Sequence, residues 1–185
     1  MPILGIMASQ ISGHLWAPEG AYDALATVTV PSGGVSTLDF AGIPTGYKHL
    51  QLRIIANVST TDAINIRFNG DTGNNYALHR LEGNGSTASA SASTTRSNIA
   101  ILTGAGFAST ASTFGASIVD VLDYTSTNKA KTTRALSGSD RNGSGGIELD
   151  SGLWFATPAA ITSINIYPSS GTIAQYSQFA LFGVK

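Results

Sequence analysis

The chain has 185 residues, which suits one ordinary domain, and it contains no cysteine, so disulfides, thiolate metal sites and thiol nucleophiles are excluded. Only 11% of the residues are charged and the formal net charge is −1, which argues against a protein that binds nucleic acid through a basic surface. Such a neutral surface does little to keep copies apart by charge repulsion, so it suits a protein that stays assembled.

The first 22 residues differ from the rest: they are too short for a domain and too apolar for a free tail. They lack the basic start and the uninterrupted apolar run of a signal peptide, and no run in the chain approaches the length of a membrane span. We interpret residues 1–22 as an arm that anchors the chain to neighbouring subunits. The residues expected at this interface are the apolar ones: Ile3, Leu4, Ile6, Ile11, Leu15 and Trp16.

Strand signals follow the arm and continue to the end of the chain. Short apolar or β-branched runs, bounded by clusters of Gly, Pro, Asn or Ser, predict about eleven strands. No segment shows a convincing helical period. The predicted strands are 25–30, 35–40, 48–57, 63–69, 76–81, 98–102, 114–123, 131–137, 147–155, 161–167 and 176–184.

Several of these runs alternate strictly between apolar and polar residues. Leu50, Leu52 and Ile54 share one face of their strand, and Trp154 on a later strand is expected in the core. Period-2 patterning with one wet face is typical of antiparallel sheets. The sequence therefore predicts an all-β fold in which residues 23–185 form an antiparallel β-sandwich, and a jelly roll fits the number of strands best.

Three stretches, 83–97, 104–113 and 138–146, are rich in Gly, Ser, Thr and Asn and are predicted to be long flexible loops. If successive strands alternate in direction, the first loop emerges at one end of the sandwich and the other two at the opposite end.

Catalytic constellations are missing from the sequence. His14, His49 and His79 have no partner at metal-ligand spacing and are interpreted as structural. Glu148 and Asp150 share one face of a strand at a distance of roughly 7 Å, which would suit an inverting glycosidase, but neighbours on a solvent face are more often simply hydrated. We expect no catalytic, cofactor-binding or metal-binding residue and no cofactor.

The densest oxygen-rich segment is the turn at 69–75, with Asp71, Asn74 and Asn75. It lacks the ligand spacing of an EF-hand loop, so a Gly/Asn-rich hairpin turn is the preferred interpretation. A bound cation is the alternative.

Four segments carry a resemblance to a known group of proteins: MPILGIMASQISGHL, IRFNGDTGNNYALHRLEGNG, IVDVLDYTSTNKAKTTRALSG and GLWFATPAAITSINIYPSSGTIAQYSQFALFGV. Together they span nearly the whole chain, which resembles small structural proteins of tailed-bacteriophage virions. The shared motifs are strands and turns, so the resemblance implies a place in a virion assembled in the host cytoplasm and no chemistry.

The resemblance leads us to expect a non-enzymatic capsid decoration (cement) subunit, forming a homo-oligomer, most simply a trimer. Its partners would be other virion proteins, the major capsid protein or tail subunits, with no nucleic acid and no membrane. The alternative is a tail-fibre or tail-tip subunit that binds host glycan through the stretches 83–97 and 138–146, although these contain no aromatic residue for stacking on a sugar. A glycosidase, the third class, requires Glu148 and Asp150 to face a cleft.

Overall fold

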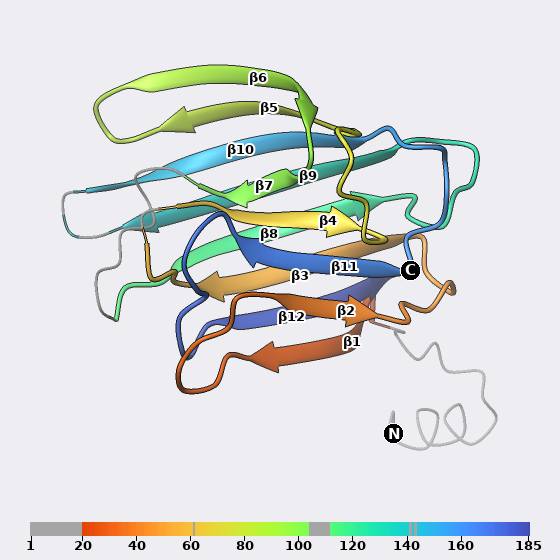
Figure 1. Ribbon diagram of the computed structural model, residues 1–185, viewed down its shortest axis with the longest axis horizontal. Helices are drawn as coiled ribbons and strands as arrows, with labels where there is room; N and C mark the ends of the chain where they lie inside the picture. Colours follow the sequence, from red (N-terminus) through yellow and green to blue (C-terminus); the bar gives the residue numbers. More distant parts are fainter. Residues whose placement is uncertain (1–19, 61, 104–111, 141, 143) are drawn as a thin grey trace, which may run out of the picture.

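The computed structural model describes residues 20–185, except 61, 104–111, 141 and 143 (Figure 1). The expected arm contacts, Ile3, Leu4, Ile6, Ile11, Leu15 and Trp16, therefore lie outside the described residues. The described part holds twelve strands and no helix. The strands are β1 (Tyr22–Thr29), β2 (Leu38–Ala41), β3 (His49–Ala56), β4 (Ile64–Phe68), β5 (Tyr76–Gly83), β6 (Ala88–Arg96), β7 (Ile99–Leu102), β8 (Gly115–Leu122), β9 (Lys131–Asp140), β10 (Gly145–Trp154), β11 (Ser163–Pro168) and β12 (Gln178–Val184).

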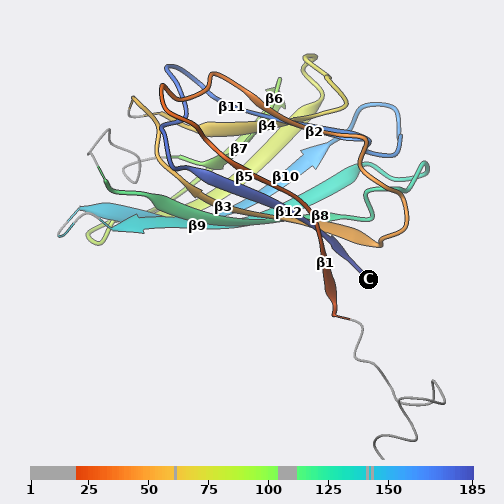
Figure 2. The ribbon, with the colours of Figure 1, turned by 90° about the horizontal axis from the view of Figure 1, so that it is seen from below.

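The strands form two sheets, and every pair of neighbouring strands is antiparallel. The larger sheet has the order β1-β12-β3-β8-β9-β10-β5-β6, and the smaller has the order β2-β11-β4-β7. Seen from the side, the smaller sheet forms one layer above the larger (Figure 2). The prediction of an all-β fold with two antiparallel sheets, as in a β-sandwich, is confirmed.

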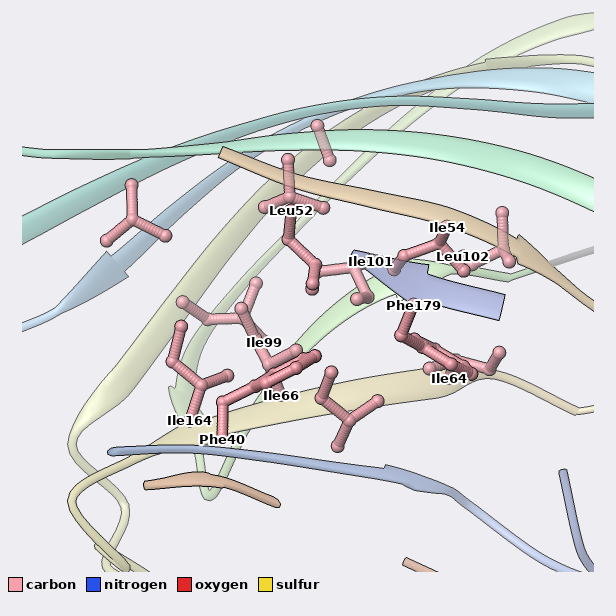
Figure 3. Packing of buried hydrophobic residues seen from close by; sticks show 14 of the residues in the cluster. Phe40, Leu52, Ile54, Ile64, Ile66, Ile99, Ile101, Leu102, Ile164 and Phe179 are labelled. Atoms are coloured by element: carbon pink, nitrogen blue, oxygen red, sulfur yellow. The ribbon is translucent and has the colours of Figure 1, made fainter. Parts of the chain in front are cut away.

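The core fills the space between the two layers (Figure 3). The alternation read from the sequence is confirmed here, because Leu50, Leu52 and Ile54 of β3 are all buried. Leu52 and Ile54 lie on the side of β3 that faces Ile64 and Ile66 of β4 in the other sheet. Each such side chain contributes about 1.5–3 kcal/mol through removal of apolar area from water. The remaining labelled core residues are Phe40, Ile99, Ile101, Leu102, Ile164 and Phe179.

The prediction that residues 83–97 form a flexible loop is wrong. Most of this stretch is β6, which pairs with β5 from Gly83 opposite Ala88 to Tyr76 opposite Arg96. Its side chains are small and mostly exposed, so backbone hydrogen bonds to β5 hold it rather than apolar burial. The actual turn is short, and the Asn84 side-chain oxygen accepts hydrogen bonds from the backbone N–H groups at 86 and 87.

The stretch 138–146 is likewise mainly strand, since β9 continues to Asp140 and β10 begins at Gly145. The prediction that this hairpin and the first loop lie at opposite ends is also wrong. β5 and β10 are neighbours with Gly83 opposite Ile147, so the turns that follow β5 and β9 emerge at the same end. The prediction failed because it did not include β6. One additional strand between β5 and β7 moves every later turn to the opposite end of the sandwich. Of the stretch 104–113, residues 104–111 lie outside the described part.

Candidate functional site

A row of large aliphatic side chains crosses the outer face of the larger sheet. Ile118 of β8, Leu136 of β9, Leu149 of β10 and Leu81 of β5 are direct cross-strand partners in sequence across the sheet. Their side chains point away from the smaller sheet and are 46–53% exposed. We call these four residues the apolar row. No described strand or turn covers this face, which is the underside of the lower layer in Figure 2.

The apolar row arises in part because β10 points its charged residues toward the core and its aliphatic residues toward solvent, the reverse of the usual arrangement. Its inward positions carry Glu148, Asp150 and Trp154, and its outward positions carry Leu149 and other aliphatic residues. Leu149 is 53% exposed, whereas Asp150 is 5% exposed. The sequence contained a signal for this arrangement, because Trp154 lies an even number of residues from Glu148 and Asp150 and so shares their face of the strand. Placing the tryptophan in the core therefore puts both carboxylates inside and the leucines outside.

The two arginines on this face contact other groups of the same molecule. In the row next to the apolar row, the Asp120 carboxylate accepts a hydrogen bond from Gln51 Nε2 at 2.9 Å and lies 3.2 Å from Arg134 Nη2. Arg53 stacks over the rings of Tyr22 and Phe182, at 5.0 and 4.4 Å from their centroids. The face is therefore apolar in its middle, with its arginines already paired to groups of the same molecule.

A hollow of about 660 Å³ runs beside the apolar row where β6 presents small side chains. Alanines of β6 form one side, and the larger side chains of β5 and β10 form the other. Its lining residues include His79, Leu81, Ala90, Ala92, Leu149 and Ser151. The outer face thus combines projecting leucines with a shallow hollow. Projections and hollows allow two protein surfaces to pack with good shape complementarity.

Glu148 and Asp150 lie on the inner face, which corrects their predicted solvent-facing position. Arg80 Nε lies 2.7 Å from Asp150 Oδ1, and Arg80 Nη2 lies 3.8 Å from Glu148 Oε2. Thr103 donates to the Glu148 carboxylate through its backbone N–H at 3.1 Å and through its hydroxyl at 2.9 Å. Burial raises the pKa of both carboxyl groups, and Arg80 opposes this effect.

The third functional class required a cleft shared by these two carboxylates. The Asp150 side chain is 1% exposed and is held by the Arg80 guanidinium. Glu148 borders a separate polar hollow of about 250 Å³ together with Glu82, its direct partner on β5. The arrangement is that of a buried ion cluster linking β5, β10 and the residue after β7.

The turn between β4 and β5 uses its carboxylate within the protein. Asp71 accepts hydrogen bonds from Trp154 Nε1 at 2.7 Å, from the Asn75 side chain at 3.0 Å and from Gly73 N at 2.8 Å. Burial raises the pKa of Asp71, but these hydrogen bonds outweigh it and the pKa lies below its usual value. Asn74 is exposed. Of the three residues in the alternative cation site, Asp71 thus already accepts hydrogen bonds from groups of the protein, including Trp154.

The histidines have separate surroundings. His49 Nδ1 accepts a hydrogen bond from Asp123 N at 2.9 Å, His79 lies on the outer face, and His14 is outside the described residues. Within the described ranges, no group of three or more His, Asp or Glu side chains could hold a metal ion.

The turns after β5 and β9 border a second polar hollow, of about 370 Å³. The residues that line it are Gly83, Asn84, Gly85, Ser139, Asp140, Ser144, Gly145, Gly146 and Ile147. Hydroxyl, amide and carboxylate groups converge there from stretches that the sequence placed at opposite ends of the molecule.

In the described part of the chain, there is no helix with the length and apolar character needed to span a bilayer. No protein-family model, curated protein or solved structure matches this chain. Its function is therefore inferred from its surfaces and from the sequence resemblance described above.

Proposed function

We propose that this chain is a non-enzymatic structural protein of a tailed-phage virion, most simply a capsid decoration (cement) subunit on the particle surface. The observation that carries the proposal is the apolar row on the outer face of the larger sheet, which none of the described strands and turns covers. Contiguous apolar patches beyond a few hundred Å² mark binding surfaces on soluble proteins. A chain with 11% charged residues and such a face suits permanent assembly better than a freely diffusing existence.

We infer that the sandwich is of the jelly-roll kind. Eight of the strands support this: β1-β12-β3-β8 is one half of the larger sheet, and β2-β11-β4-β7 is the smaller sheet. In both sets of four, early strands of the chain pair with its last strands. Two Greek keys of this type define a jelly roll. The pairs β5–β6 and β9–β10 then extend one of the two sheets, and this extension bears most of the apolar row.

The N-terminal arm is the second proposed contact. Residues 1–22 would anchor the subunit to the major capsid protein or to an adjacent subunit through Ile3, Leu4, Ile6, Ile11, Leu15 and Trp16. Many modest contacts of this kind, repeated over a shell, hold a particle together through avidity. The virion proteins are the partners, and assembly takes place in the host cytoplasm.

Deletion of residues 1–16 tests the anchoring role. The twelve strands of the described part begin at or after Tyr22, so the shortened chain should keep the β-sheet signal and thermal unfolding of the full chain. We expect it to lose binding to particles that lack the protein, with an exposed-turn variant, Thr45→Glu, binding normally. Equal binding of the shortened and full chains would contradict the arm proposal.

The second candidate is a tail-fibre or tail-tip subunit that binds host glycan. The polar hollow of about 370 Å³ between the turns after β5 and β9 favours it, since two turns converge there. Its lining contains no aromatic side chain for stacking on a sugar. Binding on a glycan array that is lost in Asn84→Ala but retained in Thr45→Glu would favour this candidate over the capsid role.

A further inference from the structure

We propose that two copies of this chain pack face to face through the outer face of the larger sheet, related by a two-fold axis that runs parallel to the strands between β9 and β10. The occupant of the apolar face is a second copy of the same chain. This pairing stands on the geometry of the face and does not depend on the virion assignment.

The size of the face matches what a stable pair needs. Six adjacent strands, from β3 to β6, present it, and the aliphatic residues of β10 extend over the span Ile147–Leu153. With strands about 4.8 Å apart and a rise of about 3.4 Å per residue, the face covers on the order of 700 Å². A standard protein interface buries about 800 Å² per partner, so a second copy can cover the whole apolar row.

The register of the strands makes the face self-complementary about this axis. The rotation places β9 over the partner's β10 and β8 over the partner's β5. Leu136 then lies over the partner's Leu149, and Ile118 lies over the partner's Leu81, because all four residues belong to one cross-strand row. Each contact occurs twice, as an isologous interface requires.

The rows on either side of the apolar row fit the same rotation. Gly138, which has no side chain, meets the partner's Ile147, one of the most exposed aliphatic residues of the face. On the other side, Asp120 lies over the partner's His79, and Arg134 lies over the partner's Ser151. In these flanking rows Ile147 meets a glycine and Arg134 meets a serine, and no like charges face each other directly. Sheets that pack in this aligned way interdigitate their side chains at a separation of about 10 Å.

The electrostatics of the whole chain do not oppose the pairing. The formal net charge is −1 per copy, so two copies repel each other only weakly. The Asp120 carboxylate already pairs with Arg134 at 3.2 Å, which limits the charge that must lose water when the faces meet. A trimer, as expected from the sequence resemblance, is a different arrangement, and a mass measurement separates the two.

Chemical cross-linking tests the geometry directly, because the chain has no native cysteine. Two single variants, Ile118→Cys and Leu81→Cys, are mixed in equal amounts and treated with a bismaleimide whose reach is shorter than the ~14 Å between β8 and β5 in one sheet. We expect a covalent dimer in the mixture and none with either variant alone, since each residue lies over the other type in the pair. A mixture of Thr45→Cys and Leu81→Cys, with Thr45 in an exposed turn, is the control and should stay unlinked.

The solution mass gives the second test on the full chain. Light scattering should give two chains per particle for the natural sequence, and the double variant Leu136→Glu/Leu149→Glu should weaken the dimer about 100-fold or more by burying like charges at the centre. Thr45→Glu should remain dimeric, and circular dichroism checks that the variants fold. A monomeric or trimeric natural chain, or cross-linking in the control mixture equal to that of the test mixture, would overturn the proposal. If the natural chain is not dimeric but still binds particles, the dimer proposal is wrong and the proposed function is unaffected.

Discussion

Arg80 and Asp150 are direct cross-strand partners on β5 and β10, and Arg80 Nε donates to Asp150 Oδ1 across 2.7 Å. The side chains are 13% and 1% exposed, so the pair is shielded from water. Arg80 also lies 3.8 Å from the Glu148 carboxylate. One guanidinium therefore compensates two buried carboxylates. The cluster lies in the part of the larger sheet formed by β9, β10, β5 and β6.

Replacing Arg80 by methionine should destabilise the protein strongly. Arg80→Met keeps much of the side-chain volume but leaves two buried carboxylates without their cation, which costs about 3–5 kcal/mol of unfolding free energy. The matched control is Arg134→Met, whose side chain is 68% exposed and whose pair with Asp120 is worth at most about 1 kcal/mol. Urea unfolding of both variants measures the difference. Equal losses of unfolding free energy in the two variants would show that the buried cluster around Arg80 contributes no more to stability than the exposed pair of Arg134 and Asp120.

Glu148→Gln should alter how stability depends on pH. Burial raises the pKa of Glu148 despite Arg80 and Thr103, and Glu82 stands directly opposite on β5. A carboxyl group with a raised folded-state pKa contributes stability below its unfolded pKa, and this contribution is lost as pH rises through the folded pKa. The natural chain should therefore lose stability relative to Glu148→Gln as pH rises above about 4.5. Unfolding curves of the two proteins that run parallel from pH 4 to 8 would contradict this account.

Tyr76 should make the fold sensitive to alkali. Its hydroxyl donates to Asp71 O and accepts from Phe68 N, both at 3.1 Å, and burial raises the pKa of this phenol from 10.0 to about 12. The unfolded chain releases this proton first, so stability present below pH 10 falls between pH 10 and 12, by up to about 1.4 kcal/mol per pH unit. Tyr76→Phe should show a shallower alkaline loss in unfolding experiments. Its cost near neutral pH is about 1–3 kcal/mol, because the N–H of Phe68 loses its partner. An alkaline loss as steep as that of the natural chain would exclude Tyr76 as the cause.

Gly152→Ala should destabilise the packing between the sheets. A Cβ atom at this position would lie 2.4 Å from Thr133 Oγ1 and 2.8 Å from Ile99 Cγ2, closer than real contacts allow. Overpacking of this kind costs about 1–3 kcal/mol. Gly46→Ala, which meets nothing within 4 Å, is the control. Thermal melts that show no difference between the two variants would mean that Ile99 moves aside freely.

The sequence was informative where apolar residues alternate toward the core. The inner face of β3 followed from its period-2 pattern, and the buried position of Trp154 was predicted correctly. Periodicity states which residues share a face but not which face is inside. For β10 the aliphatic face points outward and the acidic one inward, because Arg80 on β5 and Thr103 after β7 supply the compensating groups. These partners come from other strands and cannot be read from β10 alone.

Strand β6 could not be found from hydrophobic patterning, since its residues are small and mostly exposed. Its stability comes from backbone pairing with β5. The strict Ala/Ser alternation from Ala88 to Ser93 was the one available signal, and it has the period of a strand. The apolar row was missed for a related reason: its four residues come from four strands, and only the register aligns them.

Our central proposal is that this chain works by packing into a phage particle rather than by catalysis. A cryo-EM map of virions from a tailed phage whose genome carries this gene, with the copies counted by quantitative mass spectrometry of the purified virions, tests this most directly. We expect density for the two-sheet fold on the outer surface of the head, in many copies, with the outer face of the larger sheet covered by protein. Virions without the chain, or density found only at the tail tip with that face open to solvent, would contradict it.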